Sequence, residues 1–127
     1  MENQVKVTAA HRDHNEWIGY LKFCKDEISS FENRLSEVVT ANNKREIVAQ
    51  VEHFQNQFIR EKEVIDILKH DIRAMENQLE VQVAANPVAT EHKRVADEPE
   101  LRERMDTFEK LFNELKEEFH GFIRVTL

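Results

Sequence analysis

The sequence contains very few of the residues that make turns: two glycines and two prolines in 127 residues. An all-β fold needs many tight turns and therefore many turn residues, so this scarcity argues against one. Charged residues make up 34% of the chain and hydrophobic residues 40%, with few aromatics, and this composition is typical of long helices. We therefore predict an all-α fold and, because the length suits one domain, a single helical domain over residues 1–127.

The sequence lacks the usual signals of several functional classes. The net charge of −7, without a Lys/Arg-rich run, argues against nucleic-acid binding, which needs clustered positive charge. The apolar runs are too short for a membrane span, and the N-terminal MENQVKVTAA has no apolar signal core. The single Cys24 cannot form an internal disulfide. These features predict a cytoplasmic protein that binds neither nucleic acid nor a membrane.

Apolar residues recur in alternating steps of three and four along three long segments, the spacing of coiled-coil a and d positions. Turn signals separate the segments: TANNK follows the first and AANP the second, where a helix rarely continues into the residue before proline. The predicted elements are helix one over about residues 8–41, helix two over about 43–85, a loop over about 86–97 and helix three over about 98–124. Helices joined by so short a turn as the first must be antiparallel neighbours, which predicts an elongated antiparallel three-helix bundle with coiled-coil-like packing.

Two polar residues occupy these otherwise apolar positions well inside the helices: His14 in the first and Glu61 in the second. Pairing the first two helices symmetrically places Glu61 level with Lys25 and Cys24. A buried, unpaired carboxylate is costly, so Glu61 should either pair with a lysine at the edge of the core or have a raised pKa. One interpretation is a polar residue that fixes the helix register, and the other is a proton-active or ligand-binding carboxylate.

The same pairing places several histidines at one end of the bundle. The candidate ligands at this His-rich end are His11, His14, His70, Asp71 and His92. Imidazole and carboxylate groups are suitable ligands for divalent metals, so this end is a candidate metal- or small-ligand-binding site. The alternative is that the imidazoles line a hydrated bundle end and help to anchor the loop. No cofactor is predicted.

Recognisable catalytic patterns are absent from the sequence. Di-iron bundles use facing Glu-x-x-His motifs, and the one such motif here, Glu117 with His120, is flanked by Phe119 and Phe122 at the inward positions. The chain has no glycine-rich phosphate loop, no Cys-x-x-Cys and no Gly-x-Ser-x-Gly turn. We therefore do not expect an enzyme. A redox or hydrolytic activity would need a cavity near Glu61, which nothing in the sequence predicts.

Apolar residues outside the a and d positions suggest a surface for a partner. A three-helix core needs a wider apolar stripe than a two-helix core, and this accounts for Val48, Val64, Leu111 and Ile123. The candidate partner-surface residues are Phe23, Ile59 and Ile67, and the wider stripe does not easily account for Phe23 or Ile59. Exposed apolar residues that cluster mark partner sites. The leading hypothesis is therefore a protein–protein interaction or scaffold module that binds another protein or, as a homodimer, a second copy of itself.

Overall fold

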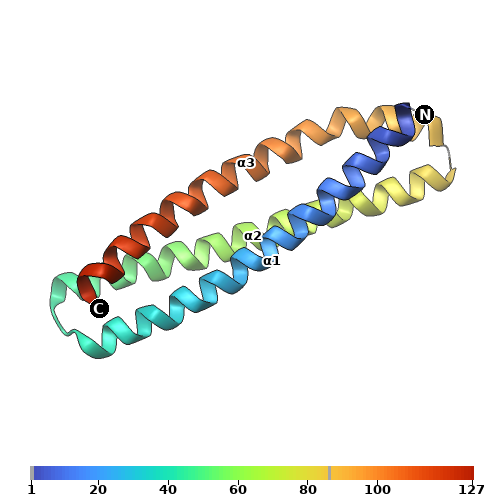
Figure 1. The fold of residues 1–127 in the computed structure, drawn as a ribbon. Coiled ribbons are helices and arrows are strands. Elements are labelled where there is room, and N and C mark those ends of the chain that lie inside the picture. Colours follow the sequence, from blue (N-terminus) through green and yellow to red (C-terminus); the bar gives the residue numbers. More distant parts are fainter. Residues whose placement is uncertain (1, 86) are drawn as a thin grey trace.

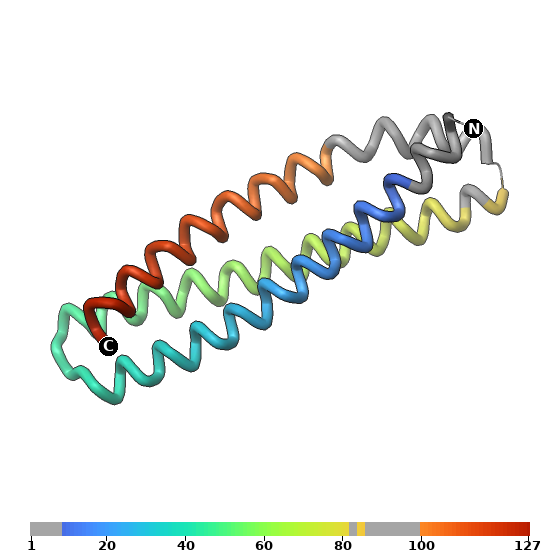
Figure 2. The backbone as a smooth tube through the Cα atoms, viewed as in Figure 1, coloured from blue at the N-terminus to red at the C-terminus, as the bar shows by residue number. Residues whose placement is uncertain are grey.

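The computed structural model consists of three long helices (Figure 1): α1 (Glu2–Ala41), α2 (Arg45–Ala85) and α3 (Pro87–Thr126). It describes the backbone of residues 2–85 and 87–127, and the side chains of residues 9–81, 84–85 and 100–127. In Figure 2 the backbone of this second set of residues is coloured. Each helix contacts both of the others, and the described residues include no strand. The all-α prediction and the three-helix bundle are therefore confirmed.

Successive helices run in opposite directions along one rod. In Figure 1, α1 leads away from the N-terminus, α2 returns, and α3 follows the direction of α1. Cross-helix ion pairs agree with this course. Lys25 of α1 pairs with Asp66 of α2, and Glu32 of α1 pairs with Lys62 of α2, so the residue numbers rise on one helix and fall on the other. Supercoiling of the three helices stays a prediction.

The core is a column of apolar side chains at the predicted a and d positions. Phe58 of α2 is fully buried, with its ring centroid 5.8 Å from that of Phe31 on α1 and 5.2 Å from that of Phe119 on α3. Phe54 and Phe122 extend this cluster, with their centroids 5.1 Å apart. Aromatic pairs in such geometries contribute about 0.5–1.5 kcal/mol each beyond the area that they bury. The cluster holds all three helices together near the turn between α1 and α2.

The predicted loop over residues 86–97 is wrong. α2 ends at Ala85, but α3 begins at Pro87 and continues through Pro99. Proline suits the first turn of a helix, because the N–H that it lacks would have no partner there. The segment that follows, VATEHKRVADE, is rich in good helix formers. The proline that ends α2 therefore also starts α3.

The other helix bounds differ less from the prediction. α1 begins at Glu2 instead of residue 8, and α2 begins at Arg45 instead of residue 43. The carbonyl of Lys44 accepts the N–H groups of Ile47 and Val48, at 3.1 and 3.0 Å, which sets the start of α2. Among the described residues, no helix has the length and apolar character needed to cross a membrane.

Candidate functional site

A groove of about 860 Å³ lies between α2 and α3, and every residue that lines it belongs to one of these two helices. Two apolar side chains on its walls are half exposed: Ile67 of α2 at 56% and Leu111 of α3 at 49%. The buried side chains that line it are Glu61, Leu68, Phe108 and Leu115. The groove is therefore a largely apolar surface with one buried carboxylate.

Uncharged side chains line part of this space. Val64 and Gln57 line the groove from α2, and Thr107 lines it from α3. At these positions no long charged side chain bridges the two helices. Nearby, Arg104 of α3 pairs with Asp71 of α2, with 2.8 Å between Nη2 and Oδ2. Among the described residues that line the groove, Arg104 alone makes an ion pair.

Glu61 is the polar group that the groove encloses. Only 9% of this residue is exposed, and its carboxylate makes no hydrogen bond or ion pair with the residues that the structure describes. Burial raises the pKa of Glu61, and the positive charge of neighbouring Arg60 offsets only part of that rise. Lys25, the partner that the sequence suggested, pairs with Asp66 instead, with 2.8 Å between Nζ and Oδ1. An enclosed carboxylate without a partner is costly, so a donor from outside the chain would stabilise it.

The rim of the groove is predominantly acidic. Glu103, Glu114 and Glu118 line it from α3, and Arg60 and His53 line it from α2. Arg104 also lines it, but Asp71 neutralises its charge. The sequence did not predict this groove. It lies beside Glu61, where an enzymatic activity would need a cavity. Its described lining includes no Ser or Cys nucleophile.

Cys24 lies in the core of the bundle and is fully buried. Burial raises the pKa of its thiol to about 11. The reactive form of cysteine is the thiolate, so this side chain behaves as a small apolar core residue.

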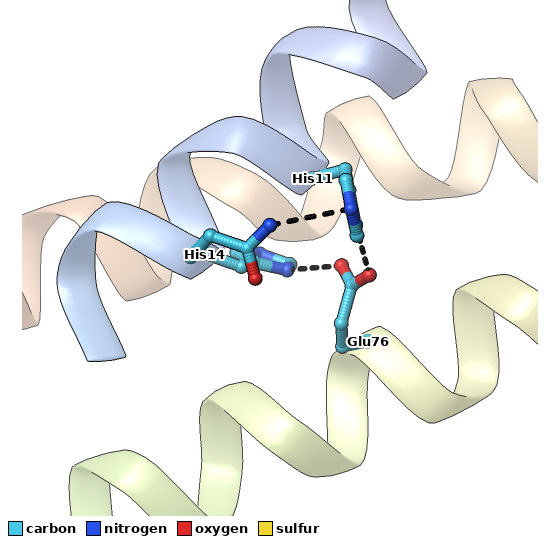
Figure 3. Close-up of polar contacts among 4 residues, drawn as sticks. His11, His14 and Glu76 are labelled. Atoms are coloured by element: carbon cyan, nitrogen blue, oxygen red, sulfur yellow. Dashed lines mark hydrogen bonds and ion pairs between the residues drawn. The ribbon is translucent and has the colours of Figure 1, made fainter. Parts of the chain in front are cut away.

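At the His-rich end, His11 and His14 converge on Glu76 of α2 (Figure 3). Nδ1 of the buried His14 lies 2.7 Å from one carboxylate oxygen of Glu76, and Nδ1 of His11 contacts the other. Asn15 donates to Nε2 of His11 at 3.3 Å. Burial raises the pKa of Glu76, but its contacts with the two histidines outweigh burial and hold the pKa below its usual range. The cluster therefore fastens α1 to α2.

Sequence reasoning missed Glu76, although a signal for it existed. The symmetric pairing of the first two helices that placed His14 beside α2 also places Glu76 close to the level of His11. Glu76 was overlooked because it lies next to Met75, at the edge of the a and d positions, where charged residues are ordinary.

The remaining predicted ligands do not join this cluster. His70 contacts its neighbour Asp71, with 3.3 Å between Nδ1 and Oδ1, and Asp71 is held by Arg104. The side chain of His92 lies outside the described residues. Among the residues that the structure describes, no three His, Cys, Asp or Glu side chains are grouped so that they could hold a metal ion.

The three predicted partner-surface residues are exposed but do not form one patch. Phe23 lies one turn from Glu27, which pairs with α3, and therefore near the boundary of α1 and α3. Ile59 lies one turn from Lys62, which pairs with α1, and therefore near the boundary of α1 and α2. Ile67 lines the groove between α2 and α3. Of the three, only Ile67 belongs to the candidate site.

Comparison with protein-family models found no match, and comparisons with curated proteins and with solved structures also found none.

Proposed function

We propose that this protein is a protein–protein interaction module that binds a helix of its partner in the groove between α2 and α3. One observation carries the proposal. The half-exposed side chains of Ile67 and Leu111 stand in the same groove as a carboxylate, Glu61, that is nearly buried and has no partner among the described residues. Such a surface has apolar area to bury and a polar group to satisfy.

An amphipathic helix suits this surface. Such helices bind by laying an apolar face into an apolar groove, with anchor residues at spacings of three and four. The groove lies along two neighbouring helices, so a bound helix would become the fourth member of the bundle. Its apolar face would cover Ile67 and Leu111, and the gain would be on the order of 25 cal/mol per Å² of apolar surface removed from water. A cytoplasmic location is part of the proposal, since the buried, free Cys24 suits a reducing compartment.

The test is selection of binders from a displayed library of amphipathic helical peptides against the full chain. Ile67→Glu and Leu111→Glu should each weaken the selected peptides by about tenfold or more, which corresponds to ~1.4 kcal/mol. Ile59→Glu is the matched control, because Ile59 is an isoleucine of the same helix with similar exposure, 50% against 56%, but lies outside the groove. It should leave binding unchanged.

Two results would contradict the proposal. One is a library that yields no binder for the folded wild-type chain. The other is a set of binders that Ile59→Glu weakens as much as Ile67→Glu, because binding would then not depend on the groove.

A further inference from the structure

We infer that the helix that occupies the groove is basic, with one Lys or Arg on its apolar face that reaches Glu61. This inference rests on the proposed function and adds the chemistry of the partner. Its basis is the position of Glu61 on the inner surface of the groove, together with the acidic rim around it.

A wholly apolar helix would fit the groove poorly. Glu61 is still 9% exposed. A wholly apolar helix would remove the remaining water from its carboxylate and would supply no hydrogen bond in exchange. Removing both water and partner from an ionised carboxylate is strongly unfavourable. A Lys or Arg from the incoming helix would instead form a charge-assisted hydrogen bond with the carboxylate.

The apolar walls suit the stem of such a residue. Lys and Arg bury their methylene groups along apolar surface and place the charge at the tip. Ile67 and Leu111 supply apolar surface in the groove, and Glu61 supplies the acceptor. One long basic side chain therefore satisfies both features of the site.

The rim favours further positive charge on the flanks of the same helix. Glu103, Glu114 and Glu118 line the α3 side, whereas the basic lining residues without an ion pair to a described carboxylate are Arg60 and His53 on the α2 side. Complementary charges around an interface steer association and exclude partners of like charge.

The same charges argue against a second copy of this chain in the groove. In a two-fold symmetric dimer the same surface of each copy faces its counterpart. Glu103, Glu114 and Glu118 of both copies would then share one interface, in a chain whose net charge is −7. Like charges brought together in this way oppose association.

The experiment uses a displayed library with one amphipathic helical framework, in which the central inward-facing position is Lys, Arg, Gln, Leu or Glu. It is selected against the full chain as wild type, Glu61→Gln and Glu63→Gln. Glu63 is an exposed residue of the same helix that does not line the groove, so its substitution changes the net charge equally without changing the site. Circular dichroism establishes that all three proteins are folded.

We expect Lys and Arg to be enriched over Leu by about tenfold or more on the wild type and on Glu63→Gln. The enrichment should disappear on Glu61→Gln. If binders are selected but the central position is Leu or Gln on all three proteins, the inference is wrong while the groove remains a helix-binding site. Basic residues that are enriched equally on Glu61→Gln would also overturn it.

Analytical ultracentrifugation distinguishes a second copy of the chain from a foreign helix as the occupant of the groove. A concentration-dependent dimer that Ile67→Glu abolishes and Ile59→Glu preserves would show that a second copy fills the groove, against the inference. A wild-type chain that remains monomeric at the concentrations of the selection, and selects basic helices, supports it. Failure to select any helix would instead count against the proposed function itself.

Discussion

The two sides of α2 are closed in different ways. Toward α1, Glu76 contacts both His11 and His14, and further along the helix Lys62 pairs with a carboxylate of α1. Toward α3, Glu61 has no described partner and lies in an open groove. The two glutamates show the consequence: the pKa of Glu76 is lowered and that of Glu61 is raised, although both are on one helix. Partners, rather than burial alone, decide whether a carboxylate stabilises the bundle.

The boundaries between the helices differ in how many of their polar and apolar groups already have partners within the chain. The boundary of α1 and α3 resembles that of α1 and α2, because Lys116 of α3 pairs with Glu27 of α1 at 3.0 Å. Polar pairs thus span both boundaries of α1. The pair of Arg104 with Asp71 spans the third boundary, between α2 and α3, but that boundary also retains half-exposed apolar side chains and a carboxylate without a described partner, which are the properties of a binding site.

The largest effect is expected where all three boundaries meet in the core. Phe58→Ala should lower the free energy of unfolding by about 3–5 kcal/mol, because the lost ring packs against both α1 and α3. Leu111→Ala in the groove should cost less than about 1 kcal/mol, because half of Leu111 is already exposed. Urea unfolding followed by circular dichroism measures both. Equal losses would mean that the groove wall is part of the core.

Glu61→Leu should stabilise the protein, in contrast to the two substitutions above. At pH 7 it should raise the free energy of unfolding by about 1–3 kcal/mol, because it removes an enclosed carboxylate that lacks a partner. Glu63→Leu, at an exposed position of the same helix, should change it by less than about 0.5 kcal/mol.

The pH dependence of this gain follows from the raised pKa. The folded protein holds a proton on Glu61 at pH values where the unfolded chain has lost it, so acidification relieves the cost of the wild-type carboxylate. The stability difference between Glu61→Leu and wild type should therefore shrink as the pH falls from 7 through the carboxylate range. A difference that is constant with pH would show that the carboxylate is not the cause.

Glu76→Gln should destabilise the protein by about 1–2 kcal/mol at pH 7, because it weakens the contacts with His11 and His14. The folded pKa of Glu76 is lowered, so the stability that its charge contributes is present above the unfolded pKa and is lost as the pH falls through the folded pKa. Thermal unfolding of both proteins across this pH range should show that the stability difference between wild type and Glu76→Gln shrinks in acid. A difference that grows in acid would show that the Glu76 charge does not stabilise the fold.

The smallest effect is expected for a partly exposed ion pair between α1 and α2. A double-mutant cycle with Lys62→Met and Glu32→Gln should give a coupling of about 0.2–1 kcal/mol, because solvent reaches both side chains, which are 32% and 33% exposed. The coupling should also weaken in high salt. A coupling above about 2 kcal/mol would show that such pairs, and not the apolar core, set the stability of this boundary.

The sequence carries most of the fold and little of the site. The alternating three- and four-residue spacing predicted the helices and the buried positions, Phe58 and His14 among them, because the spacing itself is the packing pattern. The predicted loop before α3 is wrong, because Pro87 both ends one helix and starts the next. Glu61 is expected either to pair with a lysine or to have a raised pKa. No described lysine pairs with it, and burial raises its pKa.

The groove could not be read from the sequence for a physical reason. It depends on which side chains of α2 and α3 lie opposite one another, and whether Val64 and Thr107 leave space there is a matter of three-dimensional packing. Exposed apolar residues such as Phe23 and Ile59 look equivalent to Ile67 in the sequence, although each lies near a different boundary of the bundle.

The most direct test of the central claim is an NMR titration of the Glu61 side-chain carboxyl carbon, in the free protein and with a selected basic helix bound. We expect a pKa above the ordinary value of about 4.3 in the free protein. The pKa should fall when the helix places a Lys or Arg beside the carboxylate. An ordinary pKa in the free protein that the bound helix leaves unchanged would show that Glu61 is not a buried acceptor for a basic partner.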